Sequence, residues 1–124
     1  MNTSLELLYL IIFSGILAVG YSYLLSGQIL SSNAGNEKMR EIAGAIQIGA
    51  KAYLNRQYKT IAIVGLIVLI IVTYFFNFLV GFGYFIGAAL SGLAGYVGML
   101  ISVQANVRTA EASRKSLQSG LSIA

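Results

Sequence analysis

Two long stretches without a charged residue constrain the fold of this chain more than any other feature. The first lies between Glu6 and Glu37, and the second lies between Lys59 and Arg108. Apolar runs of about 20 residues are long enough to cross the hydrocarbon core of a bilayer as helices. Of the 124 residues, only 10% are charged, whereas a soluble domain carries about 25% charged residues. We therefore predict an all-α integral membrane protein.

Three transmembrane helices are predicted, over residues 7–30, 61–79 and 82–103. At about 1.5 Å per residue, the last of these would extend for roughly 30 Å, which matches the hydrocarbon thickness of a bilayer. Ser, Asn and Gly cluster at residues 31–35 and predict a turn there. A second turn, which contains no charge, is predicted at residues 77–83.

Residues 37–60 have an amphipathic pattern. Asn36 is expected to cap a helix that has Glu37 in its first turn. The apolar residues share one arc of this helix: Met39, Ile42, Ala43, Ile46, Ala50, Tyr53 and Leu54. The chain contains no Pro, so one long cytoplasmic helix is predicted to run on into the second transmembrane helix. The alternative is a helix that lies on the lipid headgroups.

The third predicted transmembrane helix has one face of small residues and an opposite face of bulky ones. The small face consists of Gly83, Gly87, Ser91, Ala94, Gly95, Gly98, Ser102 and Ala105. The bulky face consists of Phe82, Phe85, Ile86, Leu93, Tyr96, Val97, Leu100 and Val103. Helices in lipid associate through close van der Waals fit, because the bilayer supplies no hydrophobic drive between them. We expect another helix to pack on the small face.

The distribution of Lys and Arg predicts the orientation. Five of them lie between the first and second predicted transmembrane helices, none between the second and third, and three after the third. By the positive-inside rule, the N-terminus lies outside, and residues 31–60 and the C-terminus lie in the cytoplasm. We expect a multi-pass protein of the cell (inner) membrane. This distribution also accounts for the net charge of +4, so no nucleic-acid partner is expected.

The sequence offers few groups for catalysis. It contains no Cys, His or Asp, which excludes disulfides, the usual zinc and haem sites and any Asp-rich magnesium site. Its four acids are Glu6, Glu37, Glu41 and Glu111. We predict no catalytic, cofactor-binding or metal-binding residue in this chain. Near Asn106, Arg108 has two possible roles, which are binding an anion or carboxylate and anchoring the helix end at the membrane interface.

Two blocks of the sequence resemble the N-terminal region of membrane-bound, ion-pumping inorganic pyrophosphatases. They are residues 44–60, GAIQIGAKAYLNRQYKT, and residues 87–110, GAALSGLAGYVGMLISVQANVRTA. Both blocks occur in the family's order and spacing, and together they cover most of the chain after Asn36. Ile48 departs from the pattern, because the family usually has Glu at this position. Any role of a carboxylate there is therefore in doubt.

The resemblance implies an N-terminal fragment, with three helices of a larger multi-helix bundle. The whole protein would be a homodimer that hydrolyses magnesium pyrophosphate at the cytoplasmic face and exports H⁺ or, in some members, Na⁺. Mg²⁺ would be its cofactor, and the remaining helices of the pump and the lipid bilayer would be the partners of this segment. The Asp-rich substrate motifs lie in later helices of the family, so this segment would be structural and belong to the outer layer. The ion and any K⁺ dependence are not decided by these residues.

Two other functions remain open on the residues alone. The chain could be a complete small membrane protein without catalysis, such as a self-associating scaffold or a rotor-ring proteolipid. A rotor proteolipid needs a carboxylate near mid-membrane, whereas the four Glu lie at or outside the ends of the predicted transmembrane helices. The other possibility is a transporter subunit that binds an apolar substrate between its helices. A reading frame that continues past Ala124 with many further helices would favour the pump.

Overall fold

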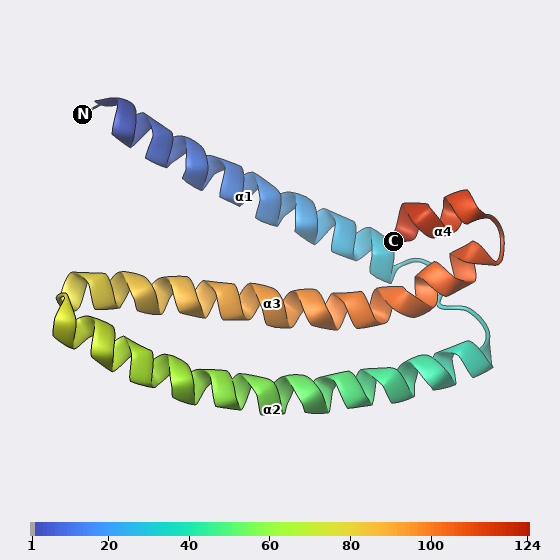
Figure 1. Cartoon of the computed structure of the whole chain (residues 1–124). Coiled ribbons are helices and arrows are strands. Elements are labelled where there is room, and N and C mark those ends of the chain that lie inside the picture. The colour runs from blue at the N-terminus through green and yellow to red at the C-terminus, as the bar shows by residue number, and fades with distance from the viewer. Residues whose placement is uncertain (1) are drawn as a thin grey trace.

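The computed structural model describes residues 2–124, and this part of the chain forms four helices (Figure 1). They are α1 (Asn2–Leu30), α2 (Glu37–Phe75), α3 (Phe78–Ser113) and α4 (Leu117–Ile123). The first three are long and apolar enough to cross a membrane, as predicted. α2 and α3 lie side by side in opposite directions. The C-terminal end of α1 is the only part of α1 that comes close to α3 (Figure 1).

α2 is one continuous helix of 39 residues, which corresponds to about 58 Å at about 1.5 Å per residue. Its first turn is capped as predicted, because the Asn36 side chain accepts a hydrogen bond from the backbone N–H of Met39 at 2.9 Å. Gly35 precedes the cap with a φ of 90°, a left-handed conformation that favours glycine. The prediction that the amphipathic segment and the second apolar segment form a single helix is therefore confirmed.

The turn between α2 and α3 is shorter than predicted. Only Phe76 and Asn77 separate the two helices, and residues 78–83 are helical, so the prediction of a turn over residues 77–83 is wrong in its extent. The reason is that the Asn77 side chain caps α3 at once, by accepting a hydrogen bond from the backbone N–H of Val80 at 2.9 Å. An early cap allows the helix to restart without further loop residues.

A break in the helix separates α3 from the short helix α4. α3 ends at Ser113, and α4 begins after Ser116, whose hydroxyl accepts a hydrogen bond from the backbone N–H of Ser119 at 3.0 Å. A Cβ atom built at Gly120 would collide with the side chain of Ser113. Glycine at position 120 therefore allows α4 to lie close to the end of α3.

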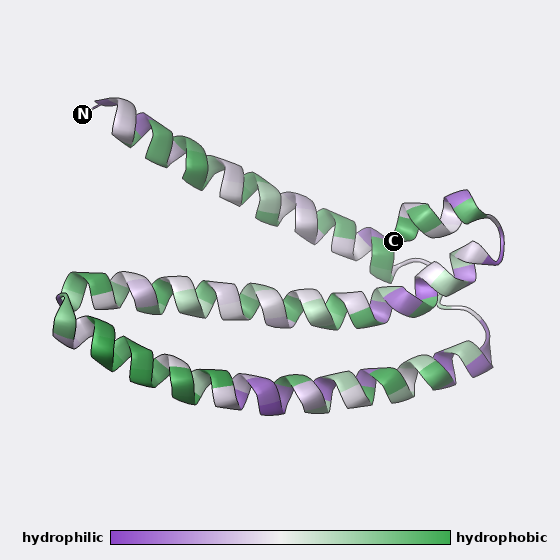
Figure 2. Cartoon of the chain, viewed as in Figure 1, coloured by the Kyte–Doolittle hydropathy of each residue, from purple (hydrophilic) through white to green (hydrophobic). Residues whose placement is uncertain are grey.

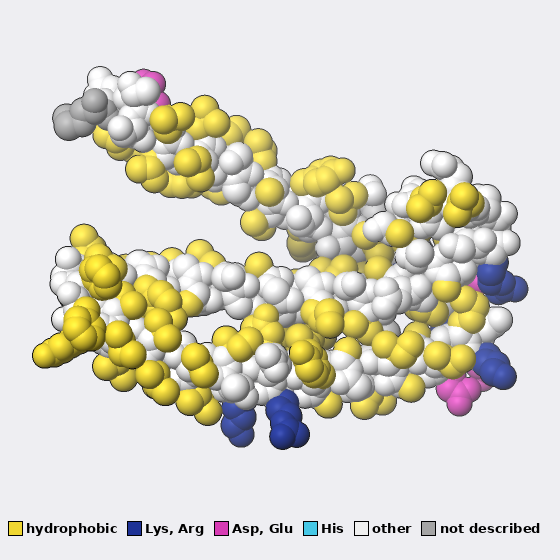
Figure 3. All heavy atoms as spheres, in the orientation of Figure 1, with side chains coloured by type: hydrophobic (Ala, Val, Ile, Leu, Met, Phe, Trp, Pro, Cys, Tyr) yellow, Lys and Arg dark blue, Asp and Glu magenta, His cyan; other side chains and the backbone are white. Residues whose placement is uncertain are grey.

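Few apolar side chains are buried among the described residues. The four buried ones are Ala43, Leu54, Val103 and Val107. Apolar residues instead cover the outer surfaces of the three long helices (Figures 2 and 3). Such surfaces suit a bilayer, where lipid chains solvate them. The contact between α2 and α3 is therefore the main tertiary contact of the described chain. Candidate sites lie along this contact and at the ends of the helices.

Candidate functional site

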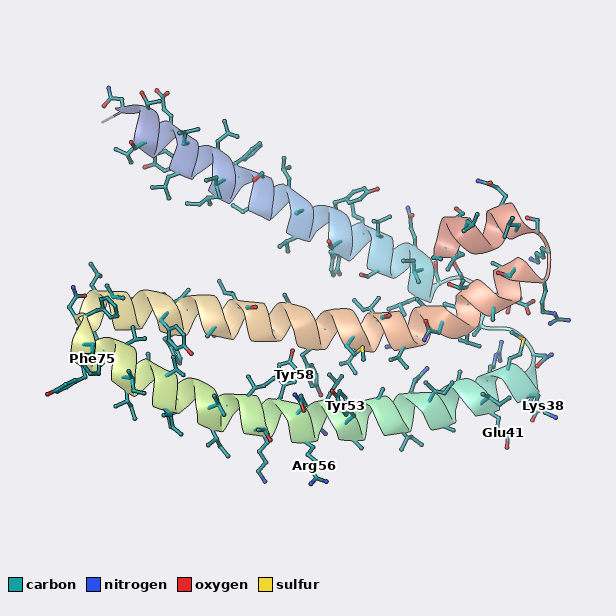
Figure 4. All side chains as sticks on the ribbon, in the orientation of Figure 1. Lys38, Glu41, Tyr53, Arg56, Tyr58 and Phe75 are labelled. Atoms are coloured by element: carbon teal, nitrogen blue, oxygen red, sulfur yellow. The ribbon has the colours of Figure 1, made fainter. Side chains whose placement is uncertain are left out.

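Tyr58 of α2 rests on two glycines of α3. A Cβ atom built at Gly92 would lie 3.6 Å from Cε1 of Tyr58, and one built at Gly95 would lie 2.7 Å from its hydroxyl oxygen. The missing side chains therefore let the Tyr58 ring come close to the α3 backbone. Figure 4 shows Tyr58 directed from α2 toward α3.

Tyr96 completes this contact from the side of α3. Its ring meets the Tyr58 ring edge to face, with centroids 5.3 Å apart and planes at 85°, a geometry that aromatic pairs favour. Its hydroxyl donates a hydrogen bond to Oδ1 of Asn55 at 3.1 Å. We call Asn55, Tyr58 and Tyr96 the tyrosine cluster. The sequence did not predict it, because the pairing of these residues depends on the register of α2 against α3. The only hint of the cluster in the sequence is the pair Gly92 and Gly95 next to the aromatic residue Tyr96.

An apolar pocket of about 540 Å³ lies between the tyrosine cluster and the turn (Figure 3). Its lining includes Ile61, Ala62, Leu66, Leu69, Phe85 and Ala88. Tyr84 bridges the two helices here, because its hydroxyl donates a hydrogen bond to the backbone oxygen of Gly65 at 3.4 Å. This lining contains no charged side chain, so it suits apolar groups and offers nothing that would neutralise a phosphate.

Toward its N-terminus, α2 packs on α3 through small and medium apolar residues. Ala43 and Leu54 from the predicted apolar arc are buried, and Met39 lines a pocket of about 220 Å³ with Val103 and other α3 residues. Ile42 and Tyr53 belong to the same arc but are 55% and 60% exposed. The arc is therefore wider than the strip that α3 covers.

The small face of α3 is not the face that α2 covers. Apart from the adjoining backbone of α3 itself, no described atom lies within 4 Å of a Cβ atom built at Gly83, Gly87 or Gly98. Gly95 is different, because it borders the α2 side of the helix and contacts Tyr58. Most of the small face is thus open within residues 2–124. The expectation that another helix packs there stays a prediction.

Arg108 lies beside a polar pocket of about 540 Å³ near the end of α3. The pocket is lined by Ser32, Asn33, Glu111, Lys115, Gln118 and Ser119, among others. Arg108 Nη1 donates a hydrogen bond to the backbone oxygen of Gln104 at 2.8 Å, and the buried Nε has no hydrogen-bond partner within residues 2–124. Asn106 lies in a different pocket, between α2 and α3. The structure therefore separates the two residues that the sequence had placed together.

The acidic residues do not gather. Glu111 pairs with Arg114, with 2.9 Å between its Oε2 atom and the Nη1 atom of Arg114. Among the described residues 2–124, no three His, Cys, Asp or Glu side chains lie where they would hold a metal ion together. That this chain supplies no metal ligand and no catalytic residue stays a prediction.

Comparison with known proteins identifies the relatives of the chain. The sequence profile of the family described as inorganic H⁺ pyrophosphatase matches residues 16–124. A K⁺-insensitive pyrophosphate-energized proton pump of Methanosarcina mazei is 40% identical over 113 residues, which cover 90% of this chain and 17% of that protein. A putative K⁺-stimulated pyrophosphate-energized sodium pump of Clostridium tetani is 41% identical over 113 residues, with 91% and 17% covered.

A third relative, a K⁺-insensitive pyrophosphate-energized proton pump of Caldanaerobacter subterraneus subsp. tengcongensis, is 39% identical over 140 residues that include all of this chain and 19% of that protein. The chain thus spans less than a fifth of the length of these relatives. No solved structure matches it significantly. The profile covers most of the chain, as the two blocks at residues 44–60 and 87–110 led us to expect. The chain belongs to the inorganic H⁺ pyrophosphatase family.

Proposed function

We propose that this chain is the N-terminal three-helix part of a pump that couples the hydrolysis of pyrophosphate to the export of H⁺ or Na⁺. The observation that carries the proposal is the match to the family over residues 16–124. The names of the relatives include both proton and sodium pumps, so the family match favours neither ion. The whole protein would be a homodimer in the cell membrane.

Within that pump, the role of this segment is structural. The described residues bury only four apolar side chains, and the small face of α3 is open at Gly83, Gly87 and Gly98. Open glycines on a membrane helix allow a second helix to approach closely. The remaining helices of the pump are the partners that would cover this face, and α1, α2 and α3 would form an outer layer around them.

Mg²⁺ would serve the whole pump as the cofactor that neutralises pyrophosphate and positions the attacking water. The residues of this chain do not fit such a site, because Mg²⁺ is held through carboxylates and the described Glu side chains form no group. We therefore assign no magnesium ligand to this chain. The ligands and the catalytic residues would belong to the rest of the protein.

The activity is tested with the product of the complete reading frame in inverted membrane vesicles. We expect pyrophosphate to be hydrolysed in the presence of Mg²⁺ and the vesicle lumen to gain H⁺ or Na⁺. The purified chain of residues 1–124 should show no hydrolysis. Hydrolysis by this chain alone, or vesicles that neither split pyrophosphate nor take up an ion, would contradict the proposal.

The structural role is tested with Gly98→Leu. Apart from the adjoining α3 backbone, nothing within residues 2–124 lies within 4 Å of a Cβ atom at Gly98, so the substitution should leave the stability of the chain alone nearly unchanged. In the complete protein, it should lower the free energy of unfolding by about 1–3 kcal/mol, because a leucine would overpack the expected helix contact. Equal stability of the variant and the unsubstituted complete protein would show that no helix packs on this face.

A further inference from the structure

Arg56 and Lys59 lie in the middle of the helical pair, far from both ends of α2. Tyr58 lies between them in sequence and contacts Gly95 and Tyr96 of α3. The two basic residues are therefore level with the middle of the uncharged stretch of α3. Figure 2 shows the same arrangement, with a hydrophilic segment in the middle of α2.

Both residues are exposed, and the Arg56 side chain projects away from α3. Figure 4 shows Arg56 and Tyr58 on opposite sides of α2, and Figure 3 shows Lys and Arg side chains on the outer side of the middle of α2. Residues three apart are neighbours on a helix surface. Neither residue forms an ion pair within the described residues 2–124. The nearest acidic residue of α2 is Glu41, which lies about 22 Å from Arg56 along the helix axis at about 1.5 Å per residue.

An apolar track continues from these two residues along the outer side of α2. It consists of Ile63, Ile67 and Ile70, which are 59%, 53% and 62% exposed. They follow Lys59 by four, eight and eleven residues, a spacing that keeps them on one helix face. The track ends at Tyr74, which is 83% exposed. From Arg56 to Tyr74 the helix rises about 27 Å, close to the roughly 30 Å of a hydrocarbon core.

We propose that Arg56 and Lys59 bind the headgroup phosphate of an anionic phospholipid, and that an acyl chain of this lipid lies along Ile63 and Ile67. Guanidinium and ammonium groups form strong, charge-assisted hydrogen bonds to phosphate. A basic residue at a membrane surface strengthens the binding of anionic lipid about fivefold. The inference rests on the register of α2 and α3 and is independent of the pump activity.

The proposed lipid site also implies where the membrane surface lies along the helices. Tyrosine is enriched at membrane interfaces, and the tyrosine cluster lies at the level of Arg56 and Lys59. The hydrocarbon region would then extend along α3 from about Phe78 to about Tyr96. The remainder of α3 and residues 37–55 of α2 would form a helical pair that projects from the membrane surface.

The test uses a single tryptophan, because the chain contains none. The full chain with Ile63→Trp is reconstituted in phosphatidylcholine vesicles that contain the same fraction of either brominated phosphatidylglycerol or brominated phosphatidylcholine. Quenching of the tryptophan gives the relative binding constant of the two lipids. We expect phosphatidylglycerol to bind at least about fivefold more strongly beside Ile63→Trp. The matched reporter Ile11→Trp in α1, where Ile11 is 67% exposed, should give a ratio near one.

Substitutions then assign the preference to the two basic residues. In the Ile63→Trp chain, Arg56→Gln with Lys59→Gln should bring the ratio close to one. The control, Lys38→Gln with Arg40→Gln, removes the same charge at the start of α2 and should leave the ratio unchanged. Exchange of the two basic residues, Arg56→Lys with Lys59→Arg, should preserve it and so show that the loss is not one of folding. Two results would overturn the proposal. One is a binding ratio near one in the Ile63→Trp chain that keeps Arg56 and Lys59. The other is an equal fall of the ratio in the Arg56/Lys59 and the Lys38/Arg40 double Gln variants.

Discussion

Gly81 and Gly83 lie in the first turns of α3 but have different surroundings. A Cβ atom built at Gly81 would collide with the Thr73 side chain and lie 3.4 Å from the Cα atom of Thr73, whereas a Cβ atom at Gly83 would have no described neighbour within 4 Å apart from the adjoining α3 backbone. Backbone atoms move less readily than the end of a long side chain. We therefore expect Gly81→Ala to lower the free energy of unfolding by about 1–3 kcal/mol.

Gly83→Ala is the matched control, because it adds the same methyl group to the same helix. It should leave the stability of the chain unchanged or raise it by up to about 1 kcal/mol, since alanine favours helix more than glycine does. Unfolding in mixed micelles, followed by circular dichroism, measures both variants. Equal effects of the two substitutions would contradict the close approach of Thr73 to Gly81.

At the scale of helices, the two-residue turn decides how α2 and α3 pair. Because the turn is short, residues at similar distances before and after it lie side by side, as Tyr58 and Tyr96 do. Asn77 makes this turn possible by capping α3. We expect Asn77→Ala to lower the free energy of unfolding by about 0.5–2 kcal/mol, whereas Asn77→Ser keeps a capping oxygen and should cost much less.

Thermal unfolding of both Asn77 variants in the same detergent gives the comparison. A serine variant as unstable as the alanine variant would show that the cap is not what holds the turn. The tyrosine cluster provides a second measurement at this scale, because a change of register would separate Tyr96 from Asn55 and remove the hydrogen bond between them.

At the scale of the whole molecule, the charge distribution predicts how the chain is inserted. The chain contains no Cys, so single-cysteine variants report on one position each. Asn33→Cys, in the turn after α1, should react with a membrane-impermeant thiol reagent only from the cytoplasmic side. Phe76→Cys, in the turn between α2 and α3, should react only from the opposite side. The reverse pattern would show that the predicted orientation is wrong.

The helices themselves could be predicted from local signals. The absence of charge marked the apolar segments, Asn36 marked the start of α2, and the absence of Pro allowed one helix to run from Glu37 to Phe75. The predicted turn is too long because Asn77 is the cap of the next helix and not one of several loop residues. A cap and a turn residue share the same chemistry, so local sequence did not separate the two.

The amino-acid sequence alone assigns the chain to the inorganic H⁺ pyrophosphatase family and predicts three helices that are long and apolar enough to cross a membrane. Long uncharged segments are stable as helices in lipid whatever their neighbours, because each helix satisfies its own backbone hydrogen bonds. Which side chains meet is instead a property of the tertiary structure: Tyr58 contacts Gly92 and Gly95 of α3, whereas Arg56 projects from the opposite side of α2. These pairings depend on the register across one short turn, and a shift of a single residue rotates a helix face by about 100°.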